Sequence, residues 1–273
     1  MRKKTLIILF AFSGLFIKNL AAQGNLIISP NRVVFDGRKQ KEELNLINAG
    51  DETASYSVSF VQRRMKEDGS FEIIEVPDEG QYFADSYLRI YPRQITLGPG
   101  EAQVVVVQCL RKPDMKDGEY RSHLYFRLEK DSAPRDDESR GNNNALSVQI
   151  TPIFGMSIPI IIRSGKVNAI TTLTDLKLEN KEGSYLTLAL NRTGNISVYG
   201  DLHVDFIPKQ GKPIEIGVMK GVAVYTNITR RNVSIALTTP TGLMLHNGKL
   251  KVRYTSRDDA RKQEVFAEAE LQL

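Results

Sequence analysis

Near its middle the chain reads Ala145-Leu-Ser-Val-Gln-Ile-Thr-Pro-Ile-Phe-Gly-Met-Ser-Ile-Pro-Ile-Ile-Ile-Arg163. Apolar and polar residues alternate over 146–151, which is the period of a strand with one apolar face. Positions 158–162 are almost continuously apolar, which indicates burial on both sides. Pro152 and Pro159 cannot donate to a ladder, so they confine the strand to an edge or to places where one side is free. We therefore predict a long strand along an incompletely paired edge, which invites pairing with another chain.

The remaining sequence after position 23 consists of short apolar or alternating runs separated by turn residues, with almost no 3.6-residue periodicity. This pattern is typical of all-β sandwiches. Runs at 26–28 and 33–35 flank Ser29-Pro30-Asn31, which predicts a kink or sheet switch in the first strand. Asp117-Gly-Glu-Tyr120 suits a tyrosine corner. A second set of strand signals follows a hinge at 163–166, so we expect two sandwich domains, 23–163 and 167–273.

Positions 1–22 have the features of a secretory signal peptide. A basic start at 2–4 precedes an apolar stretch at 6–17, and Leu20-Ala21-Ala22 precedes a cut that would leave Gln23 first. The apolar stretch is too short for a membrane span, and no cysteine lies near the cut. The alternative is an uncleaved N-terminal anchor. We expect cleavage, and hence a secreted protein without a membrane anchor.

Removing this segment changes the charge argument. The full chain carries a formal charge of +5, and four cations with no acid lie in 1–22, so the mature chain would carry +1. A nearly neutral chain gives no bulk electrostatic case for nucleic acid or an anionic membrane. The single cysteine, Cys109, excludes an intrachain disulfide and is expected to be a small buried thiol.

No catalytic, cofactor or metal constellation stands out. His123, His203 and His246 lie far apart without metal-ligand spacing, and we expect the first two to be half-buried polar residues within strands. The acidic run 136–138 lacks the spaced ligands of a calcium loop. We therefore expect a protein that is not an enzyme and that has no cofactor.

Several motifs together carry a resemblance to a family. The stretches are Arg32-Val-Val-Phe-Asp-Gly37, Ile90-Tyr-Pro92 with Leu97-Gly-Pro-Gly-Glu-Ala-Gln103, Gly118-Glu-Tyr-Arg-Ser-His-Leu124, Gly155-Met-Ser-Ile-Pro-Ile-Ile-Ile-Arg163 and Asn195-Ile-Ser-Val-Tyr-Gly-Asp-Leu202. In order and spacing they resemble the PapD-like periplasmic pilus chaperones of the chaperone–usher pathway, and most closely the archaic branch. The resemblance covers nearly all of the mature chain.

The resemblance implies two immunoglobulin-like β-sandwiches in a boomerang arrangement, located in the periplasm. It also implies donor-strand complementation, in which a strand of the first domain fills the groove of a pilin subunit before delivery to an outer-membrane usher. Matched onto this chain, the donor residues are Leu146, Val148 and Ile150. These are the same alternating apolar residues that the strand pattern singles out.

The resemblance also assigns two arginines. Arg32 matches the residue that anchors the pilin's C-terminal carboxylate, a role suited to the planar fork of a guanidinium. Arg163 matches a member of an interdomain salt-bridge network. The chain departs from the family where many members carry a second basic anchor, a lysine, because the aligned residue here is Pro159. The second anchor is therefore left open, with another nearby arginine as one possibility.

Two other classes compete with this interpretation. A secreted structural or adhesive two-domain sandwich would use the apolar row at 146–150 to fill its own core. A secreted hydrolase on a β scaffold would need converging acid and base groups, and the sequence offers no candidate pair.

Overall fold

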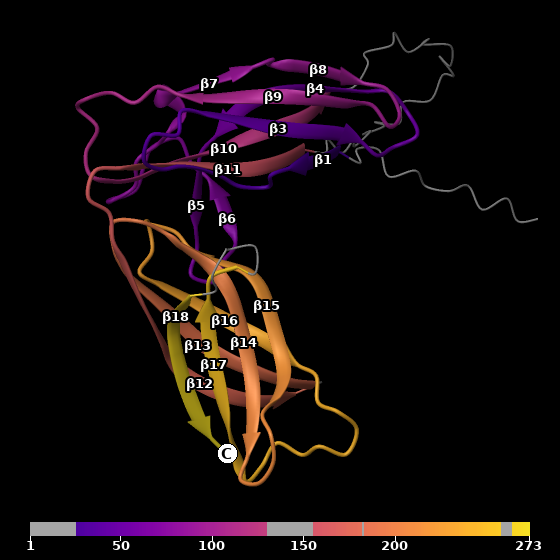
Figure 1. Ribbon diagram of the computed structural model, residues 1–273, viewed down its shortest axis with the longest axis vertical. Helices are drawn as coiled ribbons and strands as arrows, with labels where there is room; N and C mark the ends of the chain where they lie inside the picture. Colours follow the sequence, from indigo (N-terminus) through magenta and orange to yellow (C-terminus); the bar gives the residue numbers. More distant parts are fainter. Residues whose placement is uncertain (1–25, 130–154, 182, 258–263) are drawn as a thin grey trace, which may run out of the picture.

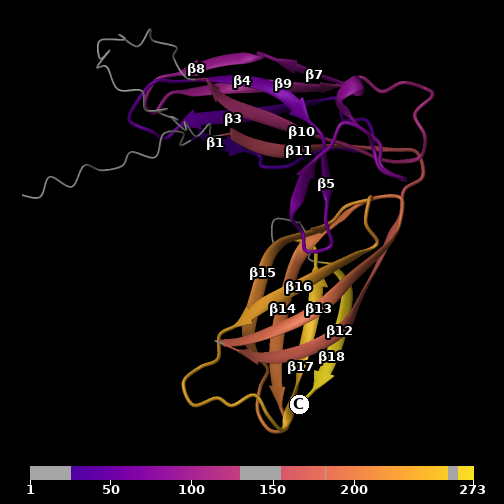
Figure 2. The same ribbon diagram turned by 180° about the vertical axis from the view of Figure 1, so that it is seen from behind.

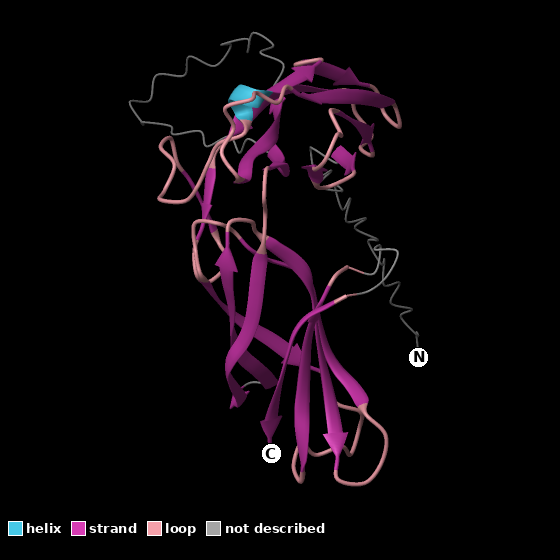
Figure 3. Cartoon of the chain, turned by 60° about the vertical axis from the view of Figure 1, so that its left-hand side comes forward, coloured by secondary structure: helices cyan, strands magenta, loops and turns pink. Residues whose placement is uncertain are grey.

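The computed structural model describes residues 26–129, 155–181, 183–257 and 264–273. Within these ranges the regular elements are strands, apart from one three-residue 3-10 helix, η1 (Asp85–Tyr87) (Figure 3). None of the described helical residues forms a segment long and apolar enough to cross a membrane. The expected signal peptide at 1–22 and the donor candidates Leu146, Val148 and Ile150 lie outside the described residues.

Two β-sandwiches make up the described chain, and their long axes lie across each other to give an L-shaped outline (Figures 1 and 2). The all-β class and the two-sandwich architecture expected from the sequence are therefore confirmed. The last strand of the first sandwich ends at Ser164 and the first strand of the second begins at Ala169. The domain limits 23–163 and 167–273 themselves remain predictions.

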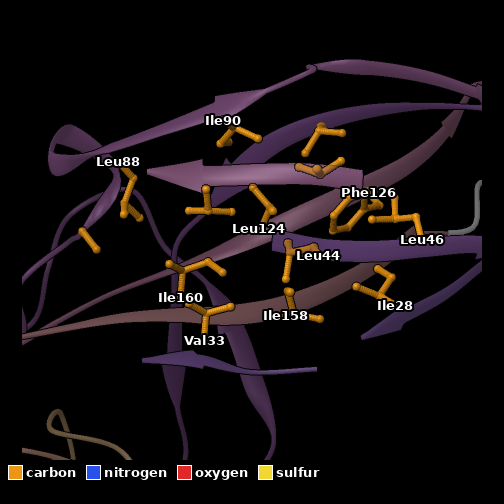
Figure 4. Close-up of a cluster of buried hydrophobic side chains, with 14 of the residues drawn as sticks. Ile28, Val33, Leu44, Leu46, Leu88, Ile90, Leu124, Phe126, Ile158 and Ile160 are labelled. Carbon is orange, nitrogen blue, oxygen red and sulfur yellow. The ribbon is translucent and has the colours of Figure 1, made fainter. Parts of the chain in front are cut away.

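The first sandwich packs a four-stranded sheet, in the order β1-β3-β9-β7, on a five-stranded sheet, in the order β2-β11-β10-β4-β8. Its strands are β1 (Leu26–Ser29), β2 (Val33–Phe35), β3 (Lys41–Asn48), β4 (Ala54–Val61), β7 (Leu88–Tyr91), β8 (Gln94–Leu97), β9 (Ala102–Cys109), β10 (Gly118–Glu129) and β11 (Gly155–Ser164). Alternate residues such as Leu44, Leu46, Leu124, Phe126 and Ile160 fill one core between the sheets (Figure 4). Cys109 is a buried free thiol, as expected.

The second sandwich has its own core, which includes Leu188, Phe206, Leu250, Val252 and Tyr254. Its sheets have the orders β12-β13-β16 and β15-β14-β17-β18. The strands are β12 (Ala169–Lys181), β13 (Gly183–Gly194), β14 (Val198–Pro208), β15 (Ile214–Val224), β16 (Arg230–Leu237), β17 (Gly248–Thr255) and β18 (Val265–Gln272). The apolar runs at 214–218 and 222–224 are separate in the sequence but belong to one strand, β15, in which a bulge opposite 200–202 accommodates Gly221 at φ +71°.

The first strand changes sheets, as its central proline predicts. Residues 26–29 pair antiparallel with β3 in one sheet, whereas 33–35 pair parallel with β11 in the other. This switch places Arg32, the residue before β2, at the level of Pro159, because Val33 is aligned with Ile160.

Strand β11 is buried on both faces, as its apolar sequence predicts. Ile160 and Ile162 belong to the first core, and Ile161 is equally buried on the opposite face. One side of β11 pairs with β10 along 155–164. On the other side β2 covers only 160–162, so the edge along 155–159 has no partner among the described strands.

A short hairpin leaves the first sandwich and reaches the second. It consists of β5 (Arg63–Met65) and β6 (Phe71–Ile73) and extends from the upper to the lower body in Figure 1. The side-chain amide of Asn227 donates to the carbonyl of Met65 at 2.9 Å, and the backbone N–H of Asn232 donates to the carbonyl of Glu67 at 2.7 Å. Met65 is buried together with Ala223 and Tyr225 of the second sandwich. The hairpin is therefore a second connection between the two bodies.

The tyrosine corner gives a stability test. The Tyr120 hydroxyl accepts a hydrogen bond from the backbone N–H of Lys116 at 2.8 Å, as the sequence predicts. We expect Tyr120→Phe to keep the ring packing but to lower the free energy of unfolding by about 1 kcal/mol. Urea unfolding followed by fluorescence measures this change. Tyr91→Phe is the matched control, because Tyr91 is 77% exposed, and an equal loss in both variants would contradict the prediction.

Candidate functional site between the two sandwiches

Alternate residues of β10 face the second sandwich. Glu119 and Arg121 contact Ser197, and His123 contacts Tyr225. The residues between them turn the other way, with Tyr120 and Leu124 in the first core. The strand period thus places an acid, a cation and an imidazole in a row on the surface where the two bodies meet.

Glu119 and Arg121 form a buried ion pair. The Arg121 guanidinium donates to Glu119 Oε1 at 2.5 Å and to the Ser197 hydroxyl at 2.6 Å. Glu119 Oε2 accepts from the Ser197 backbone N–H at 2.9 Å and from its hydroxyl at 2.7 Å. Burial alone would raise the pKa of Glu119, but the Arg121 charge and the Ser197 hydrogen bonds outweigh it and hold the pKa below its usual range. Glu119 is therefore ionised at neutral pH.

Arg163 lies at the edge of this network. Its Nε is 4.0 Å from Glu119 Oε2, and its carbonyl accepts from Arg111 at 2.8 Å. The structure thus places Arg163 beside the carboxylate that contacts the second sandwich. Its energetic contribution to holding the two domains remains a prediction.

Arg32 carries a charge without an acidic partner. Its guanidinium lies 4.4 Å from the centre of the Tyr199 ring in the second sandwich, which is a cation–π arrangement. No described residue forms an ion pair or hydrogen bond with it. Burial, with the neighbouring charges of Arg121 and Arg163, lowers the pKa of Arg32 to about 10, although Glu119 and Tyr225 act in the opposite direction. A cation held in this way is suited to an incoming anion.

Two hollows meet at Arg32. One, of about 230 Å³, is bounded by the β5–β6 hairpin, Pro159 and the Tyr199 and Tyr225 rings. The other, of about 540 Å³, is bounded by Arg163, Ser197 and the starts of β12 and β18. Both are lined by residues of the two sandwiches, so Arg32 is placed where a ligand would contact both domains.

His123 does not act as an acid or base at neutral pH. Its Nε2 lies 3.1 Å from the Tyr225 hydroxyl, and its Nδ1 has no partner among the described residues. Burial and the charges of Arg121, Arg63 and Arg32 lower its pKa to about 3. Our expectation of a half-buried residue is wrong, because His123 is 4% exposed beneath the hairpin and the second sandwich. His203 is half-buried as expected and pairs with Glu215 at 2.9 Å.

Metal chemistry has no candidate in this part of the molecule. Among the described residues no group of three or more histidines, cysteines or acids is placed to hold a metal ion.

Sequence reasoning found Arg32 and Arg163 but missed most of the residues around them. The sequence did contain a signal for Glu119, Arg121 and His123. They are polar residues at every second position of a strand, so they form a face opposite the one that packs in the core. Tyr199, Tyr225 and the hairpin had none, because their role depends on how the two bodies meet. The donor candidates Leu146, Val148 and Ile150 are not brought to the site, since they lie outside the described residues.

No protein-family model matches this chain, and no curated protein matches it in sequence. Solved structures similar to this chain include several chaperones. The YadV chaperone has a TM-score of 0.46 and 11% identity, covering 92% of this chain and 100% of that one. The CupB2 chaperone of Pseudomonas aeruginosa has a TM-score of 0.42 and 14% identity, covering 90% and 100%.

A third similar structure is the CsuC–CsuE chaperone–adhesion subunit complex from the archaic chaperone-usher Csu pili of Acinetobacter baumannii. Its TM-score is 0.44 and its identity 13%, with 91% of this chain and 99% of that one covered. At these identities and TM-scores the likeness transfers no residue role to this chain.

The buried imidazole predicts a specific pH dependence. The unfolded chain protonates His123 near its ordinary pKa of 6.5, but the folded chain does so only near 3. Between these values the unfolded state binds more protons, so stability is full above pH 6.5 and falls as pH decreases. We expect His123 to account for about 2 kcal/mol of the loss between pH 7.5 and pH 5.

Urea unfolding of the wild type and of His123→Gln over that pH range measures this effect as a difference in how steeply the free energy of unfolding changes with pH. His246→Gln, at an exposed position, is the control and should keep the wild-type slope. A His123→Gln variant with the same pH dependence as the wild type would refute the assignment.

Proposed function

We propose that this chain is a periplasmic assembly chaperone that is not an enzyme. It binds pilin subunits by donating a strand and passes them to an outer-membrane usher. The observation that carries the proposal is the position of Arg32. Its guanidinium has no acidic partner among the described residues, and it stands at one end of the unpartnered edge of β11.

In this proposal, the position of Arg32 sets the direction of a bound chain. Arg32 lies at the level of Pro159, and the open edge extends from there back to Gly155. A chain whose C-terminal carboxylate contacts Arg32 would therefore run along 155–159 in the same direction as β11. It would lie end to end with β2, which is also parallel to β11. Strand addition of this kind uses the backbone for affinity and side chains for specificity.

Residue parity supports the donor assignment. Ile158, Ile160 and Ile162 face the first core, and Met156 in the same row is 40% exposed where the core ends. Leu146, Val148 and Ile150 are also at even-numbered positions, as are the residues of this row. In an uninterrupted strand they would extend the apolar row beyond the chaperone's own core, as a donor strand requires.

Burial of the three donor side chains would favour the complex. A large apolar side chain contributes about 1.5–3 kcal/mol when it is fully buried, so three contribute roughly 5–9 kcal/mol before ordering costs. The carboxylate anchor would also set the register of the bound pilin strand. In any other register the carboxylate would be buried without a cation, which costs on the order of several kcal/mol.

The anchor is tested by Arg32→Ala. We expect stable pilin complexes to be lost, because the carboxylate would be buried without a cation, while the chaperone stays folded. The measurement is the amount of pilin that co-purifies per folded chaperone after co-expression in the periplasm. Arg38→Ala is a matched control at an exposed position near the same strand. Wild-type pilin recovery with folded Arg32→Ala would refute the role of Arg32.

The donor strand is tested by comparing two neighbouring substitutions. We expect Val148→Asp to abolish pilin recovery and Gln149→Asp to retain most of it, because the two side chains point to opposite faces of a strand. Both variants should be secreted and folded. Equal losses, or unfolding caused by Val148→Asp, would indicate that this row fills the protein's own core, as in the structural or adhesive alternative.

A further inference from the structure

The smaller hollow at Arg32 contains a second arginine, and that arginine belongs to the other sandwich. Arg231, in β16, lines the same space of about 230 Å³ as Arg32. The other described lining residues are aromatic, apolar or neutral, and none is acidic. With a water occupying about 30 Å³ of liquid volume, this hollow has room for a carboxylate and its adjoining carbons but not for a folded segment.

Arg231 is held in place by two neighbouring backbones. Its Nη1 donates to the carbonyl of Ala223 at 2.7 Å. A Cβ at Gly69 in the hairpin turn would overlap the Arg231 guanidinium, so only a glycine allows this close approach. The Nε of Arg231 is buried and has no hydrogen-bond partner among the described residues. The Arg231 guanidinium is therefore held in one orientation, but not all of its N–H groups have hydrogen-bond acceptors.

The nearby acids are engaged elsewhere. Asp68 accepts hydrogen bonds from the Ser70 backbone at 2.8 Å and from the Ser70 hydroxyl at 2.6 Å. Asp175, on the far side of Arg231, pairs with Arg230 at 2.7 Å. Burial lowers the pKa of Arg231, and Tyr254, Tyr225 and Asp68 act in the opposite direction, with Asp68 the smallest of the three. Two cations thus share a small, acid-free hollow, which favours an anion between them.

We propose that Arg231 is the second cationic anchor of the site, so that one terminal carboxylate is held between Arg32 of the first sandwich and Arg231 of the second. This rests on the carboxylate role proposed above for Arg32. It assigns the second anchor to the other domain, where strand β11 has Pro159. A bound chain end then bridges the two domains as well as pairing with β11.

Two other arginines fit the role less well. Arg121 already contacts Glu119, Ser197 and the Tyr225 ring, and it lines neither hollow. Arg163 borders the larger hollow, where Glu264 is also present, and its Nε faces Glu119. Arg231 is the arginine that shares an acid-free space with Arg32.

The test uses acetate as the minimal carboxylate and acetamide as its neutral counterpart. The Nε–Hε signals of the arginines are followed by NMR in the full mature chain during each titration. We expect the Arg32 and Arg231 signals to move together with acetate, with one shared dissociation constant, and to stay fixed with acetamide. An Arg231 signal that does not respond, or an Arg163 signal that moves in its place, would overturn the proposal.

Variants make the test quantitative. Arg231→Gln should weaken acetate binding measured at Arg32 roughly tenfold, because one charge-assisted hydrogen-bonding partner is lost. Gly69→Ala should weaken it as well by displacing the guanidinium. Gly80→Ala is the matched control, because Gly80 also has a positive φ (+73°) but has open space around a Cβ. Unchanged binding in folded Arg231→Gln would overturn the proposal.

Pilin recovery separates this inference from the proposed function. If Arg32→Ala loses pilin and Arg231→Gln recovers it at the wild-type level, the proposed function stands and the second anchor is wrong. If both variants lose acetate binding but retain pilin, the two arginines form an anion site and the proposed anchoring of pilin is wrong.

Discussion

The buried pair of Glu119 and Arg121 is the interaction on which the space between the sandwiches depends. Taking two charges out of water costs several kcal/mol each, and the cost is offset only when every oxygen and N–H finds a partner. Among the described residues, Glu119 Oε2 accepts its hydrogen bonds only from Ser197 of the second sandwich. Separating the two bodies would leave that oxygen without them. The ion pair therefore couples the fold of the first domain to the position of the second, as a surface salt bridge would not.

This coupling also sets the charge of the surface where the sandwiches meet. Arg32, Arg121 and Arg163 lie near Glu119. Arg121 and Arg163 lower the pKa of Arg32, whereas Glu119 raises it. The mature chain as a whole would be nearly neutral, so the positive potential is local. A local excess of positive charge inside low-dielectric walls attracts an anion to one place, whereas a high overall positive charge would attract anions to the whole surface.

The sequence predicted the fold well because its signals are local. Alternation, turn residues and the prolines of the first strand and of β11 set the strands, the sheet switch and the open edge. It failed where local signals misled or were missing. The apolar runs at 214–218 and 222–224 are separate in the sequence, but a bulge lets β15 continue between them. The roles of the hairpin, Tyr199 and Arg231 were missed because they arise only when the two domains pack, and no short-range sequence pattern shows how two domains contact each other.

The choice of arginine at position 32 follows from the same physics. Burial and two neighbouring arginines lower the pKa of Arg32 to about 10, yet its guanidinium remains charged at neutral pH because the ordinary pKa of an arginine is the highest among the side chains. A lysine starts about two units lower, so the same surroundings would bring it close to neutral pH and the charge would be partly lost. In these surroundings a guanidinium therefore keeps its charge at neutral pH where a lysine would lose part of it, and β11 has Pro159 in place of a lysine.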